Sequence, residues 1–394
     1  MRLNWTAARK SLGTALIGAG VAWGISGQIC GGDISRAQAA TDVRPAQEPS
    51  QGDVANFQNA QVETRAIHGS LGEEIGRWTA SAAKARWLGY AVTKAQGQSS
   101  ICCSDWGNGS HGGCGACSLE DRRSGISFNS SDEKTPKVRL EGVSRMAVMY
   151  RAENAKIGKI RVFSLGCTAD AGGLDVLWLE GVAASESVTV LERFVTPDEA
   201  SGEGHESIGK SALTALALHG DRSADRVMES FVSPDRPEWL RRETAFWLGE
   251  ARGAEGLRAL EKMSKNDPSP HVRDQVAFAL SVSAEPGALS EMIRMAREDP
   301  DGHVRGQALF WLAQKAGKNA ESAISGAVQN DPDTEVKKKA VVALSQMPQD
   351  EGVPKLIEVA TTNRNPEVRK QAMFWLGQSN DPRALEFFEK VLTQ

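Results

Sequence analysis

The sequence has little of what marks nucleic-acid-binding and membrane proteins. Its 46 Lys and Arg are balanced by 50 Asp and Glu, for a net charge of −4. It therefore lacks the excess positive charge with which proteins neutralise nucleic-acid phosphates, and it has no polybasic patch for an anionic membrane. No segment after the N-terminal region is apolar over the roughly 18 residues of a membrane span. We predict no nucleic-acid binding and no stable membrane insertion once the N-terminal region is removed.

Familiar catalytic signatures are also missing. There is no Gly-x-Ser-x-Gly nucleophile elbow and no His-Glu-x-x-His zinc motif. The sequence therefore identifies no catalytic residue, no metal site and no cofactor, and it favours a binding role over an enzymatic one.

The N-terminus has the layout of an export signal. Arg2, Arg9 and Lys10 precede an uncharged stretch over residues 11–32, and Ala37-Gln38-Ala39 then offers small residues for cleavage. We expect a signal over residues 1–39 and a mature protein in the periplasm or outside the cell, with a retained membrane anchor as the alternative. The residue before Cys30 is Ile, so a lipid anchor is not expected.

Cysteines are few, and four of them cluster in a glycine-rich stretch. In an exported protein such a cluster favours disulfides. We expect bridges between the pair Cys102 and Cys103 and the pair Cys114 and Cys117. A zinc site that includes His111 and a redox centre are the alternatives. The odd number of cysteines in the mature chain leaves one over, and we assign Cys167 as the lone thiol.

Composition divides the rest of the chain into three parts. Residues 40–62 are rich in Gln, Pro, Ala and Asp and are expected to form a flexible linker. Residues 63–200 alternate short apolar runs with glycine-rich breaks, which predicts a small β or α+β domain, mainly antiparallel. Its strand candidates are 85–92, 137–140, 146–151, 159–164 and 174–179, followed by a helix within 185–194. A hinge is expected at 201–204.

From residue 203 to the end the sequence repeats every 32 residues. One apolar column comprises Ile208, Leu240, Val272, Val304, Val336 and Val368. Two more, starting at Leu216 and Met228, recur at the same interval. Such a period is typical of a solenoid in which each unit packs on its neighbours. The spacing within each unit predicts two antiparallel helices, so we expect about six helix pairs.

A polar pair recurs at a fixed offset in the repeat. Asp267, Asp299 and Asp331 stand six residues before Arg273, Arg305 and Lys337, and Arg369 follows Asn363 in the same way. This ladder and the phrase Pro366-Glu367-Val368-Arg369-Lys370-Gln371-Ala372 resemble the short HEAT repeats named after the phycobiliprotein lyases. The resemblance covers residues 203–394 and implies that each Asp links neighbouring units. The fold class expected for the whole chain is α+β: a small β-rich domain followed by an all-α HEAT-like solenoid.

An aromatic column alternates with alanine. Trp247, Trp311 and Trp375 are separated by Ala279 and Ala343. The column is interpreted as large and small side chains filling the space between helices, and the other interpretation is a ligand-binding stripe.

Two enzymatic alternatives come from HEAT-like relatives. Deoxyhypusine hydroxylases would imply paired His-Glu steps around a di-iron site, but this chain has one such step, His205-Glu206. His271, His303, Glu335 and Glu367 share one column, and successive positions stand roughly 10 Å apart, too far to share an ion. Lyase activity is implied only by the subgroup name. We expect an exported scaffold that docks a protein partner on its solenoid. A metal- or thiol-dependent enzyme centred on Cys102–Cys117 is the alternative.

Overall fold

The structure is a computed structural model that describes residues 54–95, 116–120, 144–196, 207–316 and 318–393. The N-terminal part holds two sheets and two helices. The larger sheet has the strand order β2-β8-β3-β5-β6, and the smaller one has the order β1-β7-β4. The strands are β1 (Asn56–Gln58), β2 (Val62–Ala66), β3 (Arg86–Thr93), β4 (Ala116–Ser118), β5 (Arg145–Glu153), β6 (Lys156–Ser164), β7 (Thr168–Asp170) and β8 (Val176–Glu180). The helices are α1 (Leu71–Ala80) and α2 (Ala184–Glu192).

Strand direction corrects one expectation from the sequence. Among the described strands, only the β3–β5 and β5–β6 pairs are antiparallel, and β2–β8, β3–β8, β1–β7 and β4–β7 are parallel. The expectation of a mainly antiparallel domain was wrong, and the α+β alternative is confirmed. The sequence pattern did not reveal the parallel pairs, because their strands are far apart in the sequence. Strands β5 and β6, in contrast, are joined by a tight turn with positive φ at Asn154 and Ala155.

The larger sheet is buried on both faces. Leu88, Tyr90 and Val92 of β3 lie in one hydrophobic core, and Trp87 and Ala91 of the same strand lie in the other. This period of two places successive side chains on opposite faces. Because both faces are covered, the strand is apolar throughout. Four of the five strand candidates coincide with β3, β5, β6 and β8, and the fifth, 137–140, lies outside the described residues.

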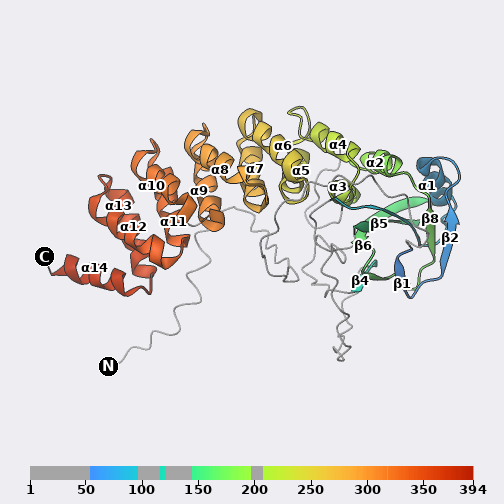
Figure 1. Ribbon diagram of the computed structural model, residues 1–394, viewed down its shortest axis with the longest axis horizontal. Coiled ribbons are helices and arrows are strands. Elements are labelled where there is room, and N and C mark those ends of the chain that lie inside the picture. The colour runs from blue at the N-terminus through green and yellow to red at the C-terminus, as the bar shows by residue number, and fades with distance from the viewer. Residues whose placement is uncertain (1–53, 96–115, 121–143, 197–206, 317, 394) are drawn as a thin grey trace, which may run out of the picture. The chain divides into compact units, whose positions relative to one another are not determined.

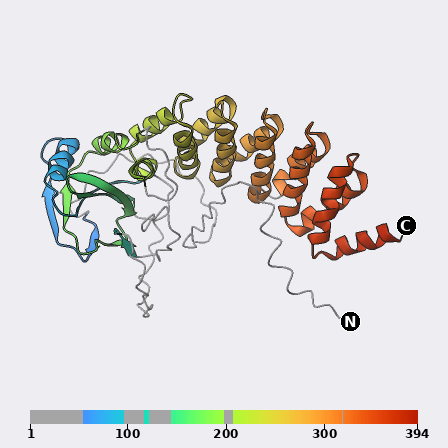
Figure 2. The same ribbon diagram turned by 180° about the vertical axis from the view of Figure 1, so that it is seen from behind.

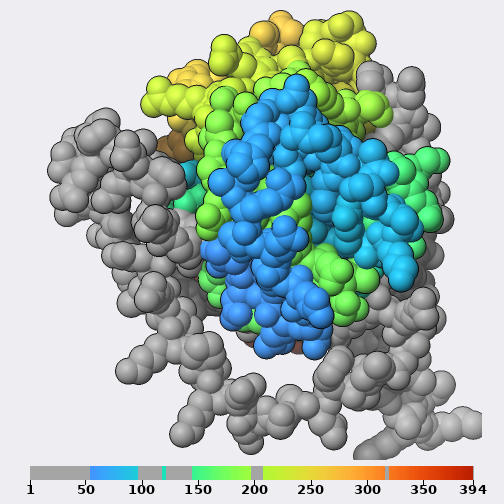
Figure 3. All heavy atoms as spheres, turned by 90° about the vertical axis from the view of Figure 1, so that its right-hand side faces the viewer, coloured from blue at the N-terminus to red at the C-terminus, as the bar shows by residue number. Residues whose placement is uncertain are grey.

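The first described strand lies within the stretch that was predicted to be a linker. β1 lies within residues 40–62, and the ring of its Phe57 is 5.7 Å from that of Trp178 and 6.3 Å from that of Phe163. Strand β1 is short and has polar residues on both sides of Phe57, so the sequence alone does not reveal it as a strand that pairs with β7. Figure 3 looks onto this end of the molecule, where β1, β2 and α1 appear in blue.

Six helix pairs follow the sheets in the described part of the chain, and we call each pair a unit. Figures 1 and 2 show the array from two opposite sides. The first helices are α3 (Ile208–Leu218), α5 (Glu238–Ala251), α7 (Pro270–Val282), α9 (Gly302–Ala316), α11 (Thr334–Gln346) and α13 (Pro366–Gln378). The second helices are α4 (Ser223–Phe231), α6 (Gly253–Asn266), α8 (Gly287–Glu298), α10 (Lys318–Asn330), α12 (Gln349–Thr362) and α14 (Pro382–Leu392). Within the described ranges, none of the helices combines the length and apolar character needed to cross a bilayer.

The repeated apolar columns form the core of the array. The column from Leu216 to Leu376 is buried in every unit, and Leu240, Val272, Val304, Val336 and Val368 are buried likewise. Helix starts are set by side chains that accept a hydrogen bond from the first turn, such as Ser269 and Asn365, each followed by a proline at the first helical position. Neighbouring first helices lie side by side, whereas neighbouring second helices are farther apart, so the array bends toward the first helices.

Candidate functional site

The Asp–Arg ladder joins the second unit to the third, the third to the fourth and the fourth to the fifth. Arg273 donates from Nε and Nη2 to the two carboxylate oxygens of Asp299, at 2.8 and 3.0 Å. Arg305 binds Asp331 with the same two distances, and Arg241 binds Asp267 at 2.8 and 3.2 Å. The third nitrogen of Arg273, Nη1, donates to the carbonyl of Asp267 at 2.9 Å.

Each ladder aspartate also shapes the turn in which it lies. Oδ1 of Asp299 accepts a hydrogen bond from the backbone N–H of Asp301 at 2.9 Å, and Asp267 and Asp331 repeat the arrangement. One carboxylate therefore accepts hydrogen bonds both from a backbone N–H of its own turn and from the guanidinium of the neighbouring unit. Bidentate pairs of this kind are strong and directional, so the ladder sets the register between units.

The ladder changes in the last two units. Lys337 replaces Arg, Asn363 replaces Asp, and Asn363 donates instead to the carbonyl of Val328 at 3.3 Å. Arg369 restores the guanidinium, and its Nη1 donates to the carbonyl of Asn363 at 2.8 Å. The ladder therefore consists of three charged pairs followed by an arginine at the end of the array.

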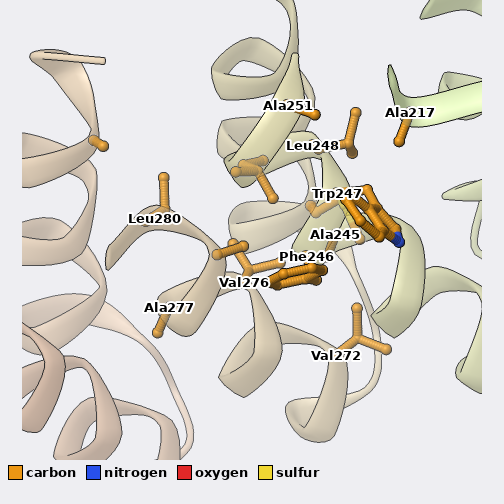
Figure 4. Packing of buried hydrophobic residues seen from close by; sticks show 14 of the residues in the cluster. Ala217, Ala245, Phe246, Trp247, Leu248, Ala251, Val272, Val276, Ala277 and Leu280 are labelled. Atoms are coloured by element: carbon orange, nitrogen blue, oxygen red, sulfur yellow. The ribbon is translucent and has the colours of Figure 1, made fainter. Parts of the chain in front are cut away.

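The tryptophan column packs against the apolar core, with Trp247 buried and Trp311 and Trp375 half-buried. Trp247 is 4% exposed, and Figure 4 shows it with Phe246 and Leu248 in the apolar core, where Val272 and Val276 also lie. Ala279 is fully buried in the next unit. The arrangement supports the space-filling interpretation of the alternating large and small residues.

A second aromatic column, one residue before the tryptophans, is buried at Phe246 and reaches solvent farther along the array. Phe246, Phe278, Phe310 and Phe374 are 32 residues apart, with Val342 in the gap. The rings of Phe246 and Phe278 are stacked 6.0 Å apart, and that of Phe278 is 4.8 Å from Trp311. Phe278 and Phe310 are half-buried, and Phe374 is exposed. The column runs along the solvent-facing side of α5, α7, α9, α11 and α13, which we call the inner surface.

A charged group stands on the inner surface one helical turn from this column. Lys339 Nζ is 3.0 Å from His303 Nδ1, and His303 Nε2 is 3.9 Å from the carboxylate of Asp274. Gly306 makes this possible, because a methyl group there would meet the Lys339 chain at 2.2 Å. Burial raises the pKa of Asp274 and lowers that of Lys339. The inner surface thus combines partly desolvated charges with half-buried aromatic rings.

A buried polar network joins the sheet to the first unit. The hydroxyls of Tyr90 and Tyr150 are 3.0 Å apart, Tyr90 is 2.9 Å from Ser187 Oγ, and Ser187 is 3.2 Å from His219 Nε2. Around it, the N–H of Gly220 donates to the carbonyl of Thr93 at 2.8 Å, so the end of α3 continues the sheet.

The histidine–serine pair in this network is not arranged for nucleophilic catalysis. The backbone N–H of Asp221 donates to His219 Nδ1 at 3.1 Å, so the proton of the neutral ring sits on Nε2 and points at Ser187. Burial lowers the pKa of His219 to about 4, which keeps the ring neutral. All four side chains are buried. A base must face its nucleophile with a free lone pair, so this group is structural.

An open pocket of about 750 Å³ lies where β2, β3 and β8 begin. Arg65, Arg77 and Arg86 line it, but each guanidinium is already bound. The buried carboxylate of Glu74 accepts hydrogen bonds from Arg65 and Arg77. Burial raises the pKa of Glu74, but these bonds outweigh the effect and leave that pKa lowered. Arg86 lies 4.9 Å from the centre of the Trp78 ring and donates to the Trp78 carbonyl. The pocket therefore offers no unpaired cluster of positive charge.

The structure contradicts one of the predictions made for the cysteines. Cys167 is disulfide-bonded, so its assignment as the lone thiol was wrong. Cys167 precedes β7, which pairs with the strand that carries Cys117, a proximity that sequence spacing could not reveal. Cys102, Cys103 and Cys114 lie outside the described residues, and so does the alternative enzyme site built on that cluster. Among the described residues no group of three or more His, Cys, Asp or Glu is placed to hold a metal ion, and His205 and Glu206 lie beyond them.

Comparison with known proteins identifies the array. The family of HEAT repeats matches residues 224–313, 289–372 and 320–394. The C-terminal part of this chain consists of HEAT repeats. No curated protein sequence matches the chain.

Several solved structures are similar to the array. Human deoxyhypusine hydroxylase in complex with glycerol is 17% identical over 52% of this chain and 90% of that chain, with a TM-score of 0.25. The CpcE–CpcF complex of phycocyanin lyase from a Nostoc species is 21% identical over 40% and 100%, with a TM-score of 0.31. The condensin Cnd3–Cnd2 subcomplex of S. pombe is 19% identical over 49% and 28%, with a TM-score of 0.33.

Two features of the candidate site escaped sequence analysis. The phenylalanine column had a visible signal, the same 32-residue spacing as the core columns, but its exposure depends on which side of each helix the neighbours cover. The contact between Ser187 and His219 had no sequence signal, because it joins side chains of two helices that are 32 residues apart in the chain.

Proposed function

We propose that this protein is an exported scaffold that binds a protein partner on the inner surface of its HEAT array. The observation that carries the proposal is the column of half-buried rings, Phe278 and Phe310 above all, next to the group Asp274, His303 and Lys339. Partly exposed aromatic side chains on a rigid scaffold, bordered by charges, are typical of binding hot spots.

Two observations support export. The N-terminal region has the layout of a cleavable signal, and the disulfide at Cys167 suits an oxidising compartment. The mass of the protein recovered from the envelope or medium tests this part. A mature chain that begins near Ala40 is the expected result, and a full-length chain retained in the cytoplasm would contradict export.

Site-specific photo-cross-linking in the native cell tests the binding surface. A photoreactive residue in place of Phe310 should yield one discrete protein adduct. The same residue in place of Lys262, which is exposed on the second helix α6, is the control and should not. Identical adducts at both positions, or none at Phe310, would contradict binding on the inner surface.

A further inference from the structure

The larger sheet has two edge strands that differ in how far they are protected against further pairing. The strand order β2-β8-β3-β5-β6 makes β2 and β6 the edges. Strand β6 contains Lys156 and Lys159, and its pairing with β5 is interrupted by a register shift next to Ala152. Lysines and bulges of this kind keep a sheet edge from pairing with another strand. Strand β2 contains neither lysine nor proline, and it pairs with β8 in an unbroken register.

The outward backbone groups of β2 are unpaired. The N–H of Val176 donates to the carbonyl of Gln61 at 2.8 Å, and the N–H of Ile67 donates to the carbonyl of Glu180 at 2.9 Å. Because backbone groups alternate in direction along a strand, the odd-numbered residues of β2 face β8. The even-numbered residues therefore point their N–H and carbonyl groups away from the sheet, and no described residue binds these groups. The outward-facing residues are Val62, Thr64 and Ala66.

The free edge is short, straight and accessible. Four of the five residues of β2 are exposed, and Val62 is 41% exposed. The chain turns at Asn59 and at Gly69, which have positive φ of 50° and 83°. These turns lie five residues before and five residues after Thr64, so the edge is centred on Thr64. Figure 1 shows β2 at the outer side of the sheet, next to β8.

The two charged side chains of β2 lie on either side of Thr64. Glu63 and Arg65 project from the same face of the sheet, because they are two residues apart. Arg65 binds the buried Glu74, but its side chain is still 37% exposed. The carboxylate of Glu63 has no partner among the described residues. The strand therefore has an anion just before its centre and a cation just after it, and this pattern complements itself when a second copy runs in the opposite direction.

We propose that two copies of this chain pair through β2, antiparallel about a two-fold axis at Thr64, so that their two sheets become one. In this register Thr64 pairs with Thr64 of the other copy, and Val62 pairs with Ala66. The outward N–H and carbonyl groups of these three residues then all form hydrogen bonds. Glu63 of each copy lies opposite Arg65 of the other, at the positions where side chains across an antiparallel pair are closest.

The charges select this register over its neighbours. The outward groups of both copies must still face each other, so the two-fold axis can move along the strand only in steps of one residue. An axis at Glu63 or at Arg65 would set two like charges directly opposite each other, which is unfavourable. Two-fold pairing also closes the interface, so a dimer is expected and not a fibre. The inner surface belongs to the helices and β2 to the sheet, so this proposal does not rest on the proposed function.

Sedimentation velocity of the full chain over a wide concentration range tests the dimer. The wild-type chain should dimerise. Thr64→Pro removes an N–H that the monomer does not use, so the fold should persist while dimerisation weakens by about tenfold or more. Glu63→Arg places an arginine opposite Arg65 in both contacts and should weaken dimerisation by a similar factor. Glu192→Arg makes the same change of charge at an exposed position of α2, and this control should dimerise like the wild type.

Cysteine cross-linking tests the register. Thr64→Cys sets two thiols opposite each other, and oxidation should link the dimer through a disulfide. The matched control is Ala66→Cys, because the two cysteines then lie four residues apart along the pair, about 14 Å and too far to bond.

Circular dichroism establishes that every variant is folded. A wild-type chain that stays monomeric at all concentrations would overturn the proposal. So would Thr64→Pro or Glu63→Arg proteins that dimerise like the wild type, a Glu192→Arg protein weakened as much as Glu63→Arg, or equal cross-linking of the two cysteine variants.

Discussion

Gly249 of α5 lies against the backbone of Ala279 in α7, so closely that a methyl group on Gly249 would stand 2.2 Å from the Ala279 carbonyl oxygen. We predict that Gly249→Ala destabilises the protein by about 1–3 kcal/mol through overpacking between the two helices. Gly377 occupies the same column in the sixth unit and has nothing within 4 Å, so Gly377→Ala should stabilise by about 0.5–1 kcal/mol. Urea unfolding followed by circular dichroism measures both, and effects of the same sign would contradict the close contact.

The ladder pair between Arg273 and Asp299 should be costly to break. Both side chains are buried, so Asp299→Ala leaves an unpaired guanidinium and should destabilise by about 3–5 kcal/mol. Lys337 stands in the arginine column without a charged partner, so Lys337→Ala should change stability by about 0.5 kcal/mol or less. The midpoints and slopes of chemical unfolding separate the two variants. Similar losses would show that the ladder does not contribute as a set of buried pairs.

His219 should make stability depend on pH between about 6.5 and 4. Burial lowers its pKa from 6.5 to about 4 in the folded protein, so the unfolded chain takes up the proton first as the pH falls. The contribution of the neutral ring to the stability of the folded protein is complete above about pH 6.5. It is lost progressively as the pH falls to about 4, and the total loss in the free energy of unfolding is about 3 kcal/mol.

The variant His219→Gln isolates this effect. Glutamine can still donate to Ser187 but does not titrate, so its unfolding free energy should vary less over the same pH window. The measurement is urea unfolding at successive pH values for both proteins. Parallel pH profiles would contradict the role of His219.

Trp247 should contribute to stability through packing. Because its side chain is 4% exposed, Trp247→Ala should destabilise by about 3–5 kcal/mol. The matched variant Phe374→Ala removes a ring that is 51% exposed and should cost much less in the monomer. Thermal unfolding of dilute protein compares the two. A small loss for Trp247→Ala would favour a surface role for the tryptophan column.

The array was predictable because each of its units repeats the same local pattern. Leu240 and Leu248 lie on one helical face, and their equivalents recur every 32 residues, so six copies of the signal reinforce one another. The sheets had no such redundancy. β3 and β5 were recognisable from local composition, but the pairing of β8 between β2 and β3 joins segments that are far apart in the chain.

The sequence by itself determined the HEAT array, its helix pairs and the residues of its ladder, because these depend on contacts between positions at fixed spacing. Tertiary structure alone decided which of those positions remain free. Arg273 and Arg369 look alike in the sequence, yet the first holds Asp299 of the next unit and the second has no carboxylate partner among the described residues. Tertiary structure likewise turned Cys167 from a lone thiol into half of a disulfide and placed His219 beside Ser187. These outcomes depend on neighbours distant in the chain, and the physical reason is that burial and hydrogen bonding are properties of the assembled fold.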